Sequence, residues 1–174
     1  DIAVTSDFIV GFPGESTADF EDTLALLETV AFDSIFAFMY SDREIAPASR
    51  FKTKIDENKK KDRLQKLLTT QEKITLAKNR MLVGTHQEIM VEGGSTRPGL
   101  AESVDEGPQW SGRTPGNKIV NFSLGGDATP APPPRVGAMV DVSIEKAFSH
   151  SLRGGLVRRE RSHDCSGREE CHAA

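Results

Sequence analysis

Cysteine is nearly absent from this chain of 174 residues: only Cys165 and Cys171 occur, both within the last ten positions. Two cysteines at one end cannot cross-link a core, so a disulfide scaffold is excluded. His163 and His172 flank them and complete a set of four potential zinc ligands. Their spacing matches no common zinc finger, and we expect residues 158–174 to be a disordered tail that holds no metal.

Long hydrophobic runs are also lacking, and so are the motifs of several common enzymes. No stretch approaches a membrane span, which needs about 18 consecutive apolar residues, and no signal peptide opens the chain. We therefore expect a cytoplasmic protein without a membrane partner. The motifs G-x-x-x-x-G-K-[ST], H-E-x-x-H and G-x-S-x-G and a glycine-rich dinucleotide turn are absent, which leaves those enzyme classes unsupported.

Charge is small in total but unevenly distributed. The formal net charge is −4, yet residues 1–49 carry ten acidic residues and one basic residue, whereas residues 50–81 carry eleven basic and four acidic residues. Most of these basic residues lie in a predicted helix at about residues 56–82, where Leu64 and Leu67 mark an apolar face. A basic helix face is most often simply solvated; the alternative is that it lies near a phosphate backbone.

The first half of the sequence has the pattern of a βαβ unit. Residues 2–11 are rich in β-branched side chains and predict a buried strand that ends in a Pro-Gly turn. Ser16 or Thr17 can cap a following helix, and residues 33–40 have the length of a second strand. A strand, a helix and a strand with short connections imply a parallel sheet with a right-handed crossover.

The second half consists of short strand-like segments separated by Gly, Pro and Asn. Five such segments favour a small β-barrel, and we place a domain boundary so that the domains comprise residues 1–83 and 84–157. Exposed loops are predicted at residues 93–107 and 125–135. The strands are predicted at residues 87–91, 109–114, 118–122, 137–144 and 149–157.

Two groups of residues are candidates for ligand binding. The turn at residues 11–15 follows a strand end, where parallel folds bind ligands and where glycine lets a ligand approach the backbone, although a plain tight turn explains it equally well. On the predicted barrel, Arg113 and Lys118 could neutralise phosphates and Phe122 could stack on a base. The alternative is that Phe122 is a core residue and Asn117 a turn residue.

Stretches in both halves together form a recognisable pattern. Residues 6–24 read S-D-F-I-V-G-F-P-G-E-S-T-A-D-F-E-D-T-L and residues 36–41 read F-A-F-M-Y-S. These closely resemble the latter part of the radical S-adenosylmethionine (SAM) domain of tRNA methylthiotransferases. Further on, G-R-T at residues 112–114 and H-S-L-R-G at residues 150–154 resemble the TRAM domain that ends these enzymes. The combination is similar to the MiaB type, and the resemblance covers about residues 2–157.

This resemblance implies a protein of the α/β plus all-β class. We expect the C-terminal βα units of a radical SAM partial TIM-type barrel, followed by a small OB-like β-barrel, the TRAM domain. Since the first residue is Asp1 and a strand-like run follows at once, we expect the chain to start within a longer protein.

The resemblance also implies a transferase that adds sulfur and then a methyl group at carbon 2 of an isopentenylated adenosine near the tRNA anticodon. Such enzymes use SAM and two [4Fe-4S] clusters, one held by a C-x-x-x-C-x-x-C motif, and need an electron donor. Neither set of cluster cysteines occurs here. We therefore expect those ligands upstream, and expect this chain alone to be an inert monomer without catalytic or metal-binding residues. The alternatives are a non-catalytic RNA-binding module and a methylthiotransferase with another substrate.

Candidate site residues follow from the resemblance position by position. The residues that match the segment beside the SAM adenine are Ile9, Val10, Gly11 and Phe12. The family's loop Tyr-Ser-x-Arg-x-Gly-Thr-x-Ala corresponds to residues 40–48, with Ile45 and Ala46 in place of the Gly-Thr pair. A β-branched residue at a glycine position is expected to change the loop conformation. The residues that match the tRNA-contacting pattern of the TRAM domain are Arg113, Thr114, Asn117, Lys118, Asn121 and Arg153.

Overall fold

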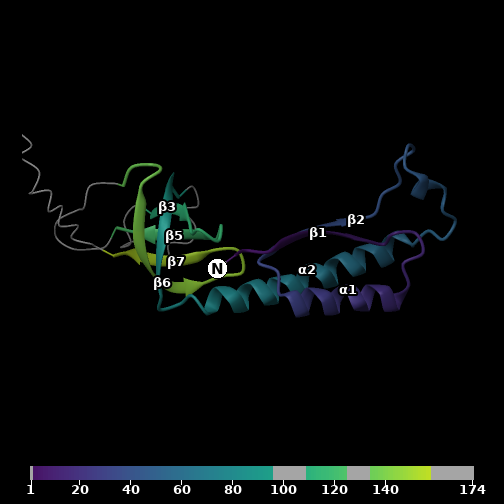
Figure 1. The fold of residues 1–174 in the computed structure, drawn as a ribbon, viewed down its shortest axis with the longest axis horizontal. Coiled ribbons are helices and arrows are strands. Elements are labelled where there is room, and N and C mark those ends of the chain that lie inside the picture. Colours follow the sequence, from purple (N-terminus) through teal and green to yellow (C-terminus); the bar gives the residue numbers. More distant parts are fainter. Residues whose placement is uncertain (1, 96–108, 125–133, 158–174) are drawn as a thin grey trace, which may run out of the picture.

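The computed structural model describes residues 2–95, 109–124 and 134–157. They form an α/β part, which lies alongside a long helix, and a β-barrel, which lies at the C-terminal end of that helix (Figure 1). No helix in these three ranges is long and apolar enough to cross a membrane. Most of the two predicted loops, and the tail at residues 158–174 with both cysteines, lie outside the described residues.

The α/β part contains the predicted strand, helix and strand in order: β1 (Thr5–Val10), α1 (Thr17–Val30) and β2 (Ser34–Met39). The two strands are parallel and in register along their whole length. Helix α1 begins at residue 17 because Ser16 caps it: the Ser16 Oγ accepts from the Asp19 N–H at 3.1 Å, and the Asp19 carboxylate accepts from the Ser16 N–H at 2.7 Å. The predicted parallel pair of strands is confirmed.

Helices α1 and α2 (Glu57–Arg80) lie against one face of this sheet (Figure 1). Side chains alternate along the strands, so Phe8 and Val10 pack under the helices. The opposite face carries apolar side chains that stay exposed: Ile9, Phe36 and Phe38. The core between sheet and helices comprises Phe8, Val10, Phe20, Leu27, Phe32 and Leu67.

The second half forms a closed five-stranded barrel, which confirms the prediction of a small β-barrel. The strand order is β3-β4-β5-β7-β6, with β5 and β7 parallel and the other pairs antiparallel. Phe122 is buried in the core of the barrel, as one of the two sequence alternatives expected. The strands are β3 (His86–Gly94), β4 (Gln109–Arg113), β5 (Ile119–Ser123), β6 (Met139–Ala147) and β7 (Leu152–Leu156).

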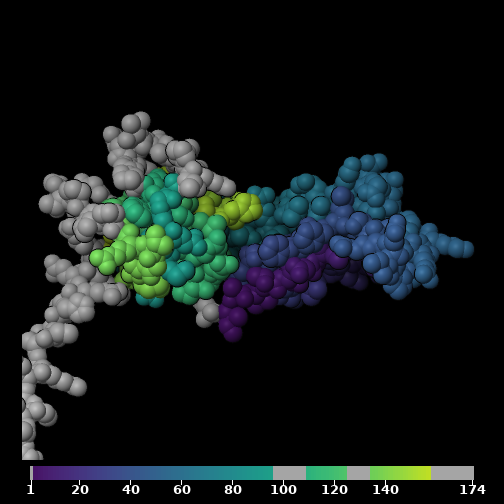
Figure 2. Space-filling model, turned by 90° about the horizontal axis from the view of Figure 1, so that it is seen from above, coloured from purple at the N-terminus to yellow at the C-terminus, as the bar shows by residue number. Residues whose placement is uncertain are grey.

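The barrel is joined to the end of α2 by backbone hydrogen bonds. The Gly84 N–H donates to the Ile144 carbonyl at 2.8 Å, and the Ile144 N–H donates to the Thr85 carbonyl at 2.9 Å. These two bonds extend the β3–β6 pairing beyond His86, so the connection from α2 to β3 is fixed to β6. In the space-filling view the α/β part extends away from one side of the barrel (Figure 2).

Candidate functional site

The two groups of predicted site residues lie at opposite ends of α2. Gly11 lies against Lys60 near the start of the helix, and Lys118 contacts Asn79 near its end. Lys60 and Asn79 are nineteen positions apart, which at about 1.5 Å per residue is about 28 Å along the helix axis. Any ligand that touches both groups must therefore be long.

The four residues predicted beside the SAM adenine differ in how far they are exposed to a ligand. Val10 is buried under the helices, so its side chain faces away from the open side of the sheet. Ile9 exposes its side chain on that open face, and Phe12 is partly exposed and packs edge-on against Tyr40, with ring centroids 5.1 Å apart. The side chains of Ile9 and Phe12 are thus available for an adenine-like ligand, whereas Gly11 is buried and its N–H is bonded to Glu15; the role of all four residues stays a prediction.

Gly11 adopts a conformation that favours glycine. Its φ is 75°, and a Cβ at this position would collide with the side chain of Lys60. Its N–H donates to the Glu15 carboxylate, which lies in the turn that leads into α1. The turn is therefore held in one shape from both sides, by Glu15 and by Lys60.

Arg63 fixes the same turn from α2 through a buried ion pair. Its Nη1 lies 2.8 Å from the Glu15 Oε2, and the two side chains are only 4% and 11% exposed. The guanidinium also donates to the carbonyls of Glu15 and Ser16, at 3.2 and 2.9 Å, and lies over the Phe20 ring. The interpretation of the basic helix face as simply solvated is wrong for Lys60 and Arg63, because both point into the molecule.

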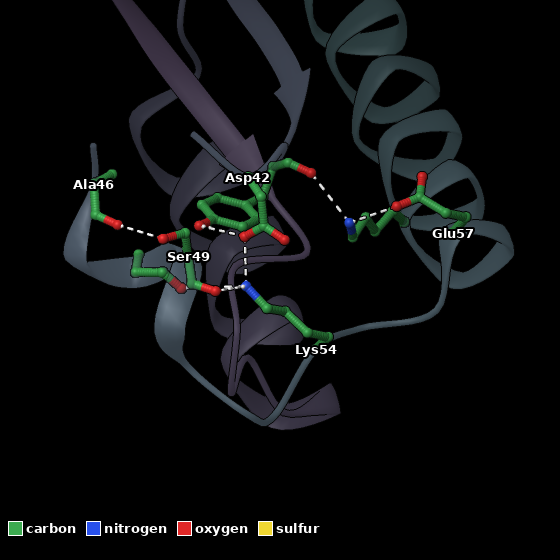
Figure 3. Close-up of polar contacts among 8 residues, drawn as sticks. Asp42, Ala46, Ser49, Lys54 and Glu57 are labelled. Carbon is green, nitrogen blue, oxygen red and sulfur yellow. Dashed lines mark hydrogen bonds and ion pairs between the residues drawn. The ribbon is translucent and has the colours of Figure 1, made fainter. Parts of the chain in front are cut away.

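The loop after β2 is closed by a second set of polar contacts (Figure 3). Asp42 accepts from the Tyr40 hydroxyl at 3.1 Å and from the Lys54 ammonium, and the hydrogen bond from Lys54 lowers the pKa of Asp42. Lys60 donates to the Tyr40 carbonyl at 3.1 Å. Lys60 and Arg63 of α2 thus hold the residues after β1 and β2, the two strand ends where parallel folds bind ligands.

Ile45 stands where the family's loop has glycine, but its backbone conformation is one that any residue can adopt. Ile45 is 99% exposed. Among the described non-glycine residues, only Ala31 and Asn117 have a positive φ, so Ile45 adopts an ordinary backbone conformation. A short 3₁₀ helix, Pro47–Arg50, follows directly, and the sequence had not indicated it.

Four of the six predicted tRNA-contacting residues lie in or beside the turn between β4 and β5. Arg113 pairs with Glu92 at 2.9 Å and donates to the Asn117 Oδ1 at 2.9 Å. Asn117 has a φ of 62°, as a turn residue can, and the buried Thr114 accepts from the Lys118 N–H. Thr114 and Asn117 therefore shape the turn, while Arg113 is the partly exposed cation at its edge.

The other two predicted residues are neighbours on the outer surface of the barrel. Asn121 in β5 lies opposite Arg153 in β7, and Ser111 in β4 lies opposite Asn121 on the other side. Val120, Phe122 and Leu152 point inward, so Asn121 and Arg153 point outward. The Asn121 Oδ1 accepts from the Ser95 hydroxyl at 3.2 Å.

Lys118 has a different position from the other five. Its Nζ donates to the Asn79 Oδ1 at 2.9 Å and lies 3.7 Å from the Asp33 carboxylate, so it joins the barrel to the α/β part. The Asn79 amide nitrogen in turn donates to the Phe148 carbonyl at 2.8 Å. Burial lowers the pKa of Lys118, and the charge of Asp33 partly offsets this effect.

Asp33 is the acidic member of this junction. Its carboxylate lies 2.7 Å from the Lys78 Nζ and also accepts from the Val4 N–H. Burial acts to raise the pKa of Asp33, but the hydrogen bonds from Lys78 and Val4 and the charges of Lys78 and Lys118 outweigh it, so the pKa is lowered. Sequence reasoning missed this group because its members are far apart in the chain.

No metal site is evident in the described part of the chain. It contains no group of three or more His, Cys, Asp or Glu side chains that could hold a metal ion.

Comparison with known proteins gives one consistent result, although no protein-family model matches the chain. A curated tRNA-2-methylthio-N(6)-dimethylallyladenosine synthase from Desulfosudis oleivorans is 44% identical over 160 residues, which is 92% of this chain and 34% of that protein. Proteins of the same description from Syntrophus aciditrophicus and Acetivibrio thermocellus are each 41% identical, over 94% and 91% of this chain and 32% and 30% of their own lengths. The chain spans about a third of the length of these relatives.

Proposed function

We propose that this chain is the C-terminal part of a tRNA methylthiotransferase that modifies carbon 2 of N(6)-dimethylallyladenosine in tRNA. The observation that carries the proposal is the similarity to synthases of that description across 92% of the chain. The closed barrel and the parallel strand pair support the proposal, because small barrels are used to bind nucleic acids and ligands bind at the carboxyl ends of parallel strands. The cytoplasm, where tRNA is modified, is the proposed site of action.

In this proposal the α/β part, residues 1–83, supplies the last βα units of the radical SAM barrel. Ile9 and Phe12 would lie beside the adenine of SAM, since exposed apolar side chains suit a flat heteroaromatic ring, and the buried Gly11 would shape the turn between them. Lys60 and Arg63 would act one step further away, by holding the turn that Gly11 belongs to. When bound to the whole enzyme, SAM and its cluster would supply radical chemistry, and the residues named here would only help to hold SAM.

The two [4Fe-4S] clusters do not fit the residues of this chain. Its two cysteines are both in the last ten positions, which is too few for the three thiolates that either cluster site of the family requires. We therefore assign no step of the reaction to residues described here. The cluster ligands and the contacts of the electron donor belong to the remaining two thirds of the length of the relatives.

The barrel, residues 84–157, is the proposed TRAM domain, and tRNA is its partner. Arg113, Asn121 and Arg153 would contact the tRNA from the outer surface of β4, β5 and β7. A non-catalytic RNA-binding module is the second candidate, and it would use the same barrel. Both proposed functions use the same barrel surface. They differ in whether the whole protein also contains a catalytic part outside this chain.

The RNA-binding part of the proposal is tested by the salt dependence of tRNA binding to this chain. Arg113→Ala should weaken binding several-fold and reduce the slope of log affinity against log salt by about one, because one phosphate contact is lost. Lys66→Ala, which removes an exposed cation of α2 at a distance from the barrel, is the matched control and should leave both quantities unchanged. Equal effects of the two substitutions would contradict the assigned surface.

The catalytic part is tested by joining this chain to the missing portion from a relative. Nucleosides from tRNA treated with the reconstituted enzyme, SAM and a reductant should contain the 2-methylthio derivative of N(6)-dimethylallyladenosine. A methylthio group on a protein instead would overturn the substrate assignment. Binding of tRNA without any modification would favour the non-catalytic module.

A further inference from the structure

A cavity lies at the junction between the barrel and the α/β part. Its volume is about 460 Å³, within the range of about 300–1,000 Å³ that small-molecule sites occupy. The beginnings of β1 and β2 and the second half of α2 form one side, and the turns after β4 and β6 form the other. Since both parts of the chain contribute, the cavity exists only when the barrel is seated on α2.

The walls are rich in groups that recognise a nucleotide base. Gln71 is 93% buried, being 7% exposed, and its amide nitrogen donates to the Phe32 carbonyl and the Thr75 hydroxyl, both at 2.9 Å. Its Oε1 is one of two buried side-chain atoms without a hydrogen-bond partner in the described ranges. Leaving such an acceptor unpaired is unfavourable, and a shift of the buried Gln71 amide toward the cavity would let an exocyclic amino group of a base satisfy it.

The charges around the cavity suit a phosphate at its rim. Arg113 lines the rim, and its pair with Glu92 is partly exposed, so it can exchange that partner at little energetic expense. Asp33 is neutralised by Lys78 and Lys118. Glu72 is the remaining carboxylate of the lining, and it is exposed.

We propose that this junction cavity takes one nucleotide of the bound RNA, with its phosphate at Arg113 and its base toward Gln71. Single-stranded RNA is generally read through bases turned out of the stack, which stack on aromatic rings and form hydrogen bonds along their edges; His150 in the lining supplies such a ring. Gln71 is eleven positions from Lys60, which is about 16 Å along α2, so a base at Gln71 lies away from the turn at Gly11 and this nucleotide is distinct from the one that would react. The inference rests on the proposed RNA binding.

The test adds a negative charge to the cavity without touching the barrel surface. Ser34 lines the cavity at the start of β2 and is exposed. Ser34→Glu should weaken the binding of an unmodified tRNA transcript about fivefold, because the added carboxylate repels the phosphate at close range. Ser34→Gln, which has the shape of Glu without its charge, should change the tRNA affinity by less than about twofold. Thr69→Glu places the same charge on the exposed surface of α2 and controls for net charge.

Each outcome bears on one part of the argument. Equal weakening by Ser34→Glu and Thr69→Glu would overturn the cavity site while leaving tRNA binding intact. No tRNA binding by the unaltered chain would instead refute the proposed function. Glu72→Gln guards against a folding defect in Ser34→Glu: removing that carboxylate should tighten tRNA binding about two- to fivefold, and unchanged or weaker binding would overturn the cavity site.

Discussion

Replacing Arg63 with methionine should destabilise the α/β part strongly, because it removes one partner of a buried ion pair. The Arg63 side chain is 4% exposed, lies 2.8 Å from the Glu15 carboxylate and also binds two backbone carbonyls. Methionine keeps most of the volume but leaves Glu15 charged and nearly enclosed. Breaking a buried pair in this way typically costs about 3–5 kcal/mol.

The matched variants separate the ion pair from the packing. Glu15→Gln keeps an acceptor for the Gly11 N–H while removing the charge. The double variant Glu15→Gln with Arg63→Met should therefore be more stable than the sum of the two single losses predicts, since no unpaired charge remains buried. A coupling of about 1–3 kcal/mol is expected for residues in direct contact.

Urea unfolding can follow the two parts of the chain separately. The single tryptophan, Trp110, lies in β4 and reports on the barrel, while far-ultraviolet circular dichroism is dominated by α1 and α2. Arg63→Met should lower the midpoint measured by circular dichroism more than the one measured by fluorescence. A loss below about 1 kcal/mol, as exposed pairs give, or strict additivity in the double variant, would refute the assigned role of the pair.

Two further predictions concern the barrel and the junction. Gly154→Ala should destabilise the barrel by about 1–3 kcal/mol in unfolding followed by Trp110 fluorescence. A Cβ at this position would collide with the Ser143 carbonyl and lie 2.9 Å from the Val142 Cγ1. Gly116→Ala is the control and should be neutral, because its Cβ would meet only the Thr114 Oγ1, at 3.8 Å. The lowered pKa of Asp33 means that its ionised form stabilises the fold at neutral pH and that this stabilisation is lost as the pH falls below about 4. Asp33→Asn should therefore be less stable at pH 7 and show a shallower loss of stability in acid, as thermal midpoints across that pH range would reveal; an unchanged acid dependence would contradict the ion pairs at the junction.

The elements that the sequence predicted well are those with a regular hydrophobic period. Val140, Val142 and Ile144 alternate with polar residues, and the structure puts Val142 and Ile144 in the barrel core, with Val140 packed against it. The end of β3 was less evident, because Gly93 was expected to begin a loop. Strand β3 continues to residue 94 through an irregularity between Val91 and Gly93, where Gly93 has a φ of 146°.

The candidate site was harder to predict wherever it depends on packing between distant segments. Lys60 and Arg63 have the side chains of a solvated helix face, and only their docking against the strand-end turns buries them. Lys118 was expected to contact RNA from the barrel, but its nearest partners, Asn79 and Asp33, belong to the α/β part. A local sequence pattern carries no information about such tertiary contacts, since they depend on how the barrel is oriented on α2.

The length of helix α2 also determines how the barrel is rotated about the helix axis relative to the α/β part. The helix runs unbroken from the turn that holds Gly11 to the residues that hold Lys118. One inserted residue would swing the barrel by about 100° around the helix axis, whereas seven would return it almost to its starting angle and move it about 10 Å further out. A barrel can therefore be exchanged between relatives only if their α2 helices have equal lengths or differ by about seven residues. The surface that faces RNA depends on the number of residues in α2 as much as on the residue types of the barrel.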